Sequence, residues 1–523
     1  MSKISVIFSK IAPLLKQACL LIFLLALALY SVVQWHPSFK DPDSFYHAQM
    51  TRLTAESGPV ADFPWLPFTI LGETFADHHF LYHWLLMPFT WLFGELAGLK
   101  VAAAVLGALA VTAFYATGRA LRLRPGLVIA GTLILATAMN FMFRMNLAKA
   151  ASLSVLLLLL GLAALARREW WALFILGWVY VWAHGSWPLL LFAAAVFALI
   201  DWWRAREWLA FACPIAGVML GFIFGLIFNP FFPENLLFYW YQTVHAALLT
   251  YDGIVNVGVE WQSYTPLSMF RANGTIFVVL AVAAATAFVA ALWHKRIVRA
   301  VSDADNRTRV LWALGIIAAA FFFMTLKSQR HIEFFAPVAV LWSLAVIDYV
   351  SRRYDLRRLY KLAFVPHRLL FMACVIFVSG AFVVMGVRDA YIVTKSFHNP
   401  DTTFAWGEYA AAAEWLEVNV PPGQVIYHAS WAEFPQLFYR APQYRYVAGL
   451  DPTFLYLKDP AAFVAWRESA AGRVRDMSAV VGHYDAQFVI VSRGEKNLRQ
   501  AVRLDSSFKL VYADKEVEIY QRL

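Results

Sequence analysis

An apolar run and the acidic stretch that follows it define the start of this chain. Residues 14–35 read LLKQACLLIFLLALALYSVVQW, and residues 41–47 read DPDSFYH. A helix needs roughly 20 consecutive apolar residues to cross a bilayer, and the first run has that length. It lacks a small-residue cleavage site, so we interpret it as a retained transmembrane helix rather than a signal peptide.

The composition extends this interpretation to most of the chain. Hydrophobic residues make up 61% of the 523 residues and charged residues 15%, against roughly 45–50% and 25% in soluble domains. Such a chain must expose much of its apolar surface to membrane lipids. The net charge of +10 does not indicate a nucleic-acid partner, because Lys and Arg fall in short clusters between apolar runs, as is typical of membrane proteins.

The apolar runs predict an α-helical polytopic membrane protein of about 11 transmembrane helices. The runs lie at 14–35, 101–118, 126–143, 151–166, 170–186, 188–203, 208–228, 273–293, 310–326, 334–350 and 369–387. A shorter run at 80–93 contains His83 and Pro88, and its location determines the orientation of every later segment.

The basic clusters favour one orientation. They lie at 3–16, 119–124, 167–168, 204–206, 295–309 and 352–368. If 80–93 does not cross the membrane, all of these clusters fall on one side, and cytoplasmic loops are the ones rich in Lys and Arg. We therefore predict an interfacial or re-entrant helix at 80–93 and a multi-pass protein of the inner cell membrane. The N-terminus is then cytoplasmic, and the long loops 36–100 and 229–272 lie outside.

The C-terminal part is predicted to be a separate α/β domain on the periplasmic or extracellular side. Polarity rises after Tyr391, which divides the chain into a transmembrane domain at 1–390 and a soluble domain at 391–523. Residues 403–419 read as an amphipathic helix that ends before Pro421-Pro422-Gly423. Strands are predicted at 424–429, 444–449, 487–492 and 509–521.

Asp41 and Asp43 are the first candidates for a chemical role. Two carboxylates two residues apart suit a hard divalent cation such as Mg²⁺ or Mn²⁺, which prefers oxygen ligands. The alternative is a helix N-terminus, where Asp and Ser accept hydrogen bonds from free N–H groups.

Cations at the predicted outer helix ends form a second group of candidates. Arg144, Lys149 and Arg330 lie where the charge pattern predicts few cations, and an anionic ligand such as a phosphate would explain them. His331 follows Arg330. The alternatives are snorkelling to lipid headgroups and a plain ion pair between Arg330 and Glu333.

Two further acidic positions are less specific. Asp77 precedes His78 and His79, a combination that could bind a metal or serve only a structural role. Glu260 lies among aromatic residues in the second long loop.

Together these residues resemble the GT-C class of membrane glycosyltransferases, and most closely the catalytic subunit of oligosaccharyltransferases. The shared features are D-x-D-x-[FY]-[YF]-H after the first helix, an Arg after the third, and R-x-x-E-x-x-x-P from Arg330 to Pro337. The resemblance implies that Asp43 binds a metal and contacts the acceptor, and that Arg330 contacts the donor pyrophosphate. Glu260 is then the acidic residue of the flexible outer loop, and Arg144 the arginine after the third helix.

The chain departs from this family at two places. A second acidic pair is expected near Arg144, but Lys149 stands there; Asp77 would replace the missing ligand, or Lys149 the cation itself. Trp431 and Glu433 occupy the position of the family's W-W-D-Y-G motif, so they are predicted to bind substrate without implying an Asn-x-Ser/Thr acceptor.

The expected function is transfer of a sugar or oligosaccharide from a polyprenyl phosphate or pyrophosphate donor to a glycan, lipid or protein acceptor. Asp43 and Glu260 are the predicted catalytic residues. Arg144, Lys149 and Arg330 are predicted to bind the phosphate, and His331 is a further predicted substrate-binding residue. The alternatives are a non-catalytic polysaccharide-assembly protein and a transporter or flippase for lipid-linked glycans. Transporters, however, place polar residues near the membrane midplane, whereas here they lie at predicted helix ends.

Overall fold

The chain forms two compact units, each assembled from segments that are distant in sequence. This computed structural model describes residues 3–249, 251, 253–292, 304–354 and 368–523, so parts of the predicted basic clusters at 295–309 and 352–368 lie outside the described residues. The helical unit comprises Met1–His36, Ala103–Gly225 and Val259–His398. The loop–tail unit comprises Pro37–Ala102, Leu226–Gly258 and Asn399–Leu523.

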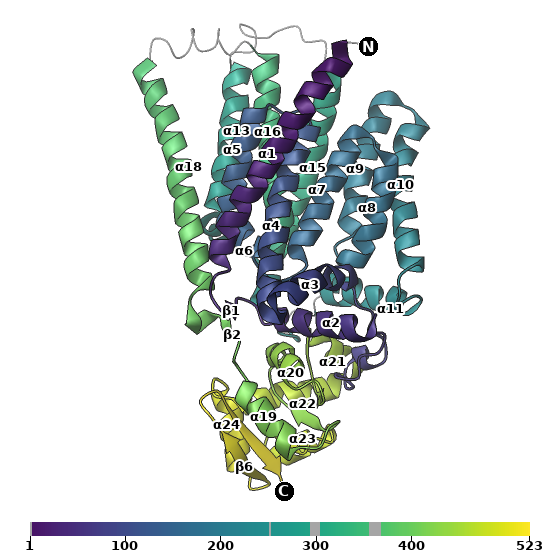
Figure 1. Cartoon of the computed structure of the whole chain (residues 1–523), viewed down its shortest axis with the longest axis vertical. Coiled ribbons are helices and arrows are strands. Elements are labelled where there is room, and N and C mark those ends of the chain that lie inside the picture. Colours follow the sequence, from purple (N-terminus) through teal and green to yellow (C-terminus); the bar gives the residue numbers. More distant parts are fainter. Residues whose placement is uncertain (1–2, 250, 252, 293–303, 355–367) are drawn as a thin grey trace. The chain divides into compact units, whose positions relative to one another are not determined.

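The apolar runs form the long helices, which run side by side in Figure 1. They are α1 (Lys3–Val33), α4 (Glu95–Ala120), α5 (Pro125–Thr137), α7 (Ala151–Arg167), α8 (Trp170–Ala183), α9 (Pro188–Ala205), α10 (Trp208–Ile227), α13 (Gly274–Leu292), α15 (Ala304–Lys327), α16 (Ile332–Arg353) and α18 (Arg368–Phe397). Two short helices, α6 (Met139–Met145) and α12 (Pro266–Ala272), belong to the same unit. Helices suit a membrane because each satisfies its own backbone hydrogen bonds.

The number of membrane-spanning helices differs from the prediction of about 11. Among the described residues, seven helices are long and apolar enough to cross a membrane, or eight if α5 and α6 together form one bent span. Three predicted spans coincide with shorter apolar helices, at Gln17–Val33, Ala151–Arg167 and Trp170–Ala183. At 1.5 Å per residue, a 17-residue helix extends about 25 Å, less than the roughly 30 Å hydrocarbon core.

Helix α16 lies at the centre of the helical unit, where it packs against α5, α6, α13 and α15. Glycines allow another close approach, between α8 and α10. A Cβ atom at Gly221 would lie 2.2 Å from the carbonyl oxygen of Phe174, so only glycine fits. Small residues of this kind let helices pack closely where lipid provides no hydrophobic driving force.

A break between α5 and α6 determines where Arg144 lies. The two helices meet at an angle of 74°, with Ala138 in an extended conformation between them. The buried carboxylate of Asp389 accepts hydrogen bonds from the Met139 backbone N–H (3.4 Å) and the Thr275 hydroxyl (2.7 Å). It therefore stabilises the free N-terminus of α6, whose last turn contains Arg144.

The loop–tail unit contains short helices and a five-stranded sheet. Its elements are β1 (Ser38–Phe39), α2 (Asp43–Ser57), η1 (Ile70–Gly72), α3 (Phe80–Phe93), α11 (Glu234–Trp240), η2 (Tyr241–Leu249), η7 (Pro400–Thr402), β2 (Phe404–Ala405), α19 (Ala410–Asn419), β3 (Val425–Tyr427), η8 (Trp431–Glu433), α20 (Phe434–Arg440), β4 (Arg445–Tyr446), α21 (Thr453–Lys458), α22 (Pro460–Ala470), α23 (Met477–His483), β5 (Phe488–Ser492), α24 (Lys496–Leu504), β6 (Phe508–Ala513) and β7 (Val517–Arg522). The strand order is β4-β3-β5-β7-β6; β3 is parallel to β4 and β5, and β7 is antiparallel to β5 and β6.

The tail elements match the sequence pattern except at the start. Each predicted strand segment contains a strand, and the last one folds into the β6–β7 hairpin. The helix predicted at 403–419 begins only at Ala410, because Phe404–Ala405 pairs with Ser38–Phe39 as a short antiparallel ladder. Tyr409 then adopts a left-handed conformation with φ of 62° immediately before the helix.

The tail shares its compact unit with the two long loops. Helix α2 packs against α20 and α3, and the Trp65 indole N–H donates to the Pro442 carbonyl at 2.7 Å. Arg467 donates to the Ile254 carbonyl at 3.0 Å. Helix α18 continues to Phe397, past the boundary predicted at residue 391. The tail therefore packs against the two long loops as well as against its own elements.

Candidate functional site

Arg144 lies at the centre of a buried ion cluster in the helical unit. Its side chain is only 6% exposed, and its Nε donates to Glu333 Oε2 at 2.7 Å. Its Nη1 donates to Glu260 Oε2. Glu333, in the first turn of α16, is fully buried. Because a buried guanidinium must be paired to be tolerated, the two carboxylates explain how Arg144 can lie here.

Glu260 brings the predicted cations together. It lies in the turn η3 (Val259–Trp261), and its Oε1 is 3.9 Å from Arg330 Nη1. The Arg330 guanidinium also lies over the Trp261 ring, 4.3 Å from its centroid. Burial by itself would raise the pKa of the Glu260 carboxyl, but the positive charges of Lys149, Arg144 and Arg330 outweigh it and hold that pKa below its ordinary value. Three predicted phosphate-binding residues therefore surround one carboxylate.

The pairing differs in detail from the sequence interpretation. The sequence also allowed a plain ion pair between Arg330 and Glu333. In the structure Glu333 pairs with Arg144 instead. His331, in the turn η4 (Gln329–His331), is half-buried, and its Nδ1 has no hydrogen-bond partner among the described residues. Because Arg144, Arg330 and Lys149 direct positive charge at one position, the cluster has the chemistry to bind an anion.

Asp41 and Asp43 lie at the start of α2 in the loop–tail unit. Asp43 is the first residue of the helix, and its backbone N–H donates to Asp41 Oδ1 at 2.9 Å. Asp41 therefore has the helix-capping role that was the alternative to metal binding. The side chain of Asp43 is partly exposed and takes no part in that cap.

Asp77 begins a chain of buried hydrogen bonds that ends on α2. Its Oδ2 lies 2.6 Å from His83 Nδ1, and His83 Nε2 lies 2.8 Å from His47 Nδ1. All three side chains are buried. With Asp77 ionised, His83 donates to it through Nδ1 and accepts from His47 Nδ1–H through Nε2. His47 is four residues after Asp43, one helical turn along α2.

The expected metal ligands do not form a metal site in the described part of the chain. Both Asp77 oxygens are already engaged, Oδ2 by His83 and Oδ1 by the His79 backbone N–H at 3.0 Å, while Asp41 caps α2. No group of three or more His, Cys, Asp or Glu that could hold a metal ion occurs among the described residues. The divalent cation expected at Asp41, Asp43 and Asp77 therefore stays a prediction.

Glu433 lies inside the tail rather than on its surface. It is buried in η8, and the Tyr409 hydroxyl donates to its Oε1 at 3.0 Å. Its other oxygen lies 3.9 Å from His428 Nδ1. Burial, reinforced by the negative charge of Glu495, raises the pKa of Glu433 well above its ordinary value. Trp431 packs partly against the tail core, so neither side chain is presented as an open contact surface.

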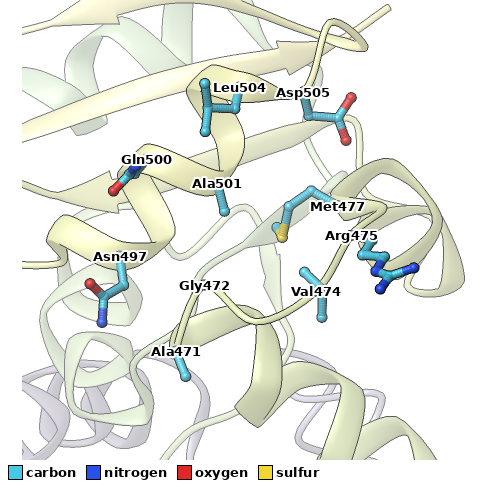
Figure 2. A pocket seen from close by; sticks show the side chains of 10 residues that line it. All are labelled: Ala471, Gly472, Val474, Arg475, Met477, Asn497, Gln500, Ala501, Leu504 and Asp505. Carbon is cyan, nitrogen blue, oxygen red and sulfur yellow. The ribbon is translucent and has the colours of Figure 1, made fainter.

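The tail also contains a cavity of about 340 Å³ (Figure 2). Residues of α24, among them Asn497 and Gln500, line one side, and the segment from Ala471 to Met477 lines the other. Its lining includes none of the residues predicted from sequence as site residues. We assign it no role.

Sequence reasoning missed three residues near these sites. His47 and His83 were present in the quoted segments but had no assigned role, although their spacing from Asp43 and His79 places each one turn along a helix. Asp389 gave no signal, because nothing in the sequence places it against the N-terminus of α6.

Comparison with solved structures identifies the fold. The apo oligosaccharyltransferase of Archaeoglobus fulgidus matches with a TM-score of 0.59 and 13% identity, covering 91% of this chain and 69% of that one. ArnT from Cupriavidus metallidurans, bound to undecaprenyl phosphate, matches with a TM-score of 0.52 and 15% identity over 98% of each chain. The arabinofuranosyltransferase AftD from Mycobacteria matches with a TM-score of 0.56 and 13% identity, covering 97% of this chain and 40% of that one.

All three are GT-C glycosyltransferases, and this chain has their fold, as the sequence resemblance predicted. At these identities the similarity establishes the fold alone. No protein-family model matches the sequence, and no curated protein matches it significantly.

Proposed function

We propose that the protein is a membrane glycosyltransferase that uses a polyprenyl phosphate or pyrophosphate donor. It would transfer a sugar or oligosaccharide to a glycan, lipid or protein acceptor on the outer face of the cytoplasmic membrane, with a cytoplasmic N-terminus. The fold supports the class of reaction, since the similar structures are glycosyltransferases and ArnT holds undecaprenyl phosphate.

The observation that carries the proposal is the convergence of Arg144, Arg330 and Lys149 on the partly exposed carboxylate of Glu260. Departure of a phosphate from a sugar places negative charge on the leaving oxygen. Preorganised cations stabilise such charge most when water is excluded, and Arg offers a planar fork that matches phosphate oxygens. We assign the donor phosphate to these cations, with His331 beside them.

We propose Asp43 as the catalytic base on the basis of the D-x-D-x-[FY]-[YF]-H resemblance. The acceptor hydroxyl or amide attacks the anomeric carbon, and the new C–O or C–N bond forms as the sugar–phosphate bond breaks. The bonding electrons leave with the phosphate, and the acceptor proton moves to the Asp43 carboxylate.

Glu260 is not a good second base. A carboxylate held by three cations strongly favours its charged form and binds a proton weakly. We therefore replace the catalytic role predicted for Glu260 with the one developed in the next subsection.

The proposal is tested by thin-layer chromatography of radiolabelled polyprenyl-linked sugars in membranes with and without the protein. Transfer should require the protein and should fall at least about 100-fold in Asp43→Asn. Asp41→Asn is the matched control and should lose much less, because Asp41 caps the helix. Equal transfer by Asp43→Asn and the parent protein would reject the assignment and favour the non-catalytic assembly protein.

A further inference from the structure

The two carboxylates that neutralise Arg144 are attached to the molecule in different ways. Glu333 belongs to the long helix α16 and is fully buried. Glu260 belongs to a single turn, and its side chain is 27% exposed. Arg144 therefore has one permanent partner, supplied by a helix, and one partner supplied by a loop.

Residues 259–263, which we call the strap, are hydrogen-bonded to residues 327–329 at the end of α15. The Ser328 hydroxyl donates to the Glu260 carbonyl at 3.1 Å, and the Gln329 backbone N–H donates to the Gln262 carbonyl at 3.1 Å. The Ser263 hydroxyl donates to the Lys327 carbonyl at 3.0 Å. Each of these is a single hydrogen bond between neutral groups of a loop and a helix end, and such bonds contribute little net stability.

Glu260 has the chemistry of the ligand proposed for this site. Its carboxylate presents two anionic oxygens to Arg144, Arg330 and Lys149, as a phosphate would. A phosphate placed on the same cations would lie beside this carboxylate, and the two negative charges would repel each other.

We infer that Glu260 is an internal occupant of a phosphate site, and that the phosphate of the lipid-linked donor binds by displacing it. The inference rests on the proposed function, because it names that donor as the competitor. Displacement moves the strap residues 259–263 away from 327–329 while Glu333 stays on Arg144, so the buried guanidinium keeps one partner throughout. Without the donor, the two carboxylates Glu260 and Glu333 partly neutralise the three cations, and donor binding is coupled to movement of the strap.

The test measures phosphate binding by the purified full-length protein in lipid nanodiscs. The probes are inorganic pyrophosphate and undecaprenyl phosphate, titrated into the parent protein, Glu260→Gln and Glu260→Asp. Glu260→Gln should bind at least about tenfold more tightly than the parent, because the competing charge is gone. Glu260→Asp keeps the charge on a shorter side chain and should fall between them.

The matched control is Glu234→Gln, which removes the same charge from an exposed position in the same long loop. It should bind both probes as the parent does. Tighter binding of undecaprenyl phosphate alone assigns the site to a lipid-linked anion, and tighter binding of both probes assigns it to phosphate in general; each outcome supports displacement. Affinities for both probes within twofold of the parent in Glu260→Gln, or absence of binding by that variant, would overturn it.

The transfer assay separates this inference from the proposed function. If Glu260→Gln binds the probes more tightly but the parent protein transfers no sugar, displacement of Glu260 is supported and the proposed glycosyl transfer is rejected. Normal transfer with unchanged affinity in Glu260→Gln would uphold the reaction and reject the displacement.

Discussion

Among the described residues of the helical unit, two buried arginine clusters lie near the two ends of α15, and they are closed in different ways. Arg309, near the start of α15, donates twice to Asp201 of α9, at 2.6 and 2.8 Å. Its remaining donors reach the carbonyls of Leu165 and Ala166 at the end of α7. Arg144, by contrast, shares its donors between a helix and a loop.

The difference separates a structural cluster from a functional one. The Arg309 cluster joins α7, α9 and α15, and it donates to carbonyls in the last turn of α7. The Arg144 cluster depends on the turn at Glu260, which is partly exposed. A cluster closed by helices contributes to stability, whereas a cluster closed by a loop can exchange that loop for a ligand.

The largest expected effect is on thermal stability, from a substitution in the Arg309 cluster, which helices close. Arg309→Ala leaves Asp201 buried among helices without its main partner, which typically costs about 3–5 kcal/mol. We expect a large fall in the thermal unfolding temperature of the full chain in detergent. Arg168→Ala is the control, because that side chain is exposed and contributes only one contact to Asp201 at 3.1 Å. Similar unfolding temperatures for both variants would contradict the structural role of Arg309.

Substitutions in the Arg144 cluster, which a loop closes, should change the affinity for phosphate rather than the unfolding temperature. Arg330→Ala removes the planar fork and the charge, and we expect pyrophosphate affinity to fall about tenfold or more, since hydrogen bonds to charged groups contribute about 1.5–3 kcal/mol. Arg330→Lys keeps only the charge and should lose less. The unfolding temperature should change little in both variants, because Arg330 pairs at 3.9 Å with the partly exposed Glu260 and such ion pairs contribute at most about 1 kcal/mol. A loss of stability without a loss of affinity would make this cluster structural as well.

A smaller effect is expected at the strap. Ser328→Ala removes the hydrogen bond to the Glu260 carbonyl, which contributes about 0.5–1.5 kcal/mol. Because this bond favours the Glu260-bound state, pyrophosphate should bind about three- to tenfold more tightly to the variant. Ser343→Ala, which removes a hydroxyl bonded only within its own helix, is the control. Weaker binding in Ser328→Ala would mean that the strap helps to hold the ligand instead of excluding it.

The comparison also shows what the sequence could predict. Helices follow from local apolar runs, so the run at 334–350 corresponds to α16, and a run of 14 residues at 80–93 corresponds to α3. Arg144 and Arg330 were recognisable because they depart from the expected charge pattern. Their partners were not recognisable, since Glu333 and Glu260 lie 189 and 116 positions from Arg144. Periodicity reports neighbours along the chain, and it carries no information on pairing at that separation.

A third way of neutralising buried carboxylates occurs in the tail, where a proton takes the place of an arginine. Glu433 and Glu495 have no Arg or Lys within ion-pair distance among the described residues. Burial raises the pKa of Glu495 to about 7 from an ordinary value of 4.5. The folded chain therefore binds this proton more tightly than the unfolded chain. The resulting stability is fully present below about pH 4.5 and is lost as the pH rises through about 7.

The smallest expected effect follows from that proton. In the full-length protein, the unfolding temperature should fall between pH 5 and pH 7, and in Glu495→Gln this fall should be smaller by about 1–3 °C, because glutamine stays neutral throughout. Glu468→Gln is the control: ion pairing with Arg473 and Arg467 lowers the pKa of Glu468 to about 2, so its removal should leave the slope between pH 5 and pH 7 unchanged. If the unfolding temperature falls equally with pH in Glu495→Gln and the parent, Glu433 and Glu495 stay charged. The carboxylates of the tail would then need a cation, as Asp201 and Glu333 do.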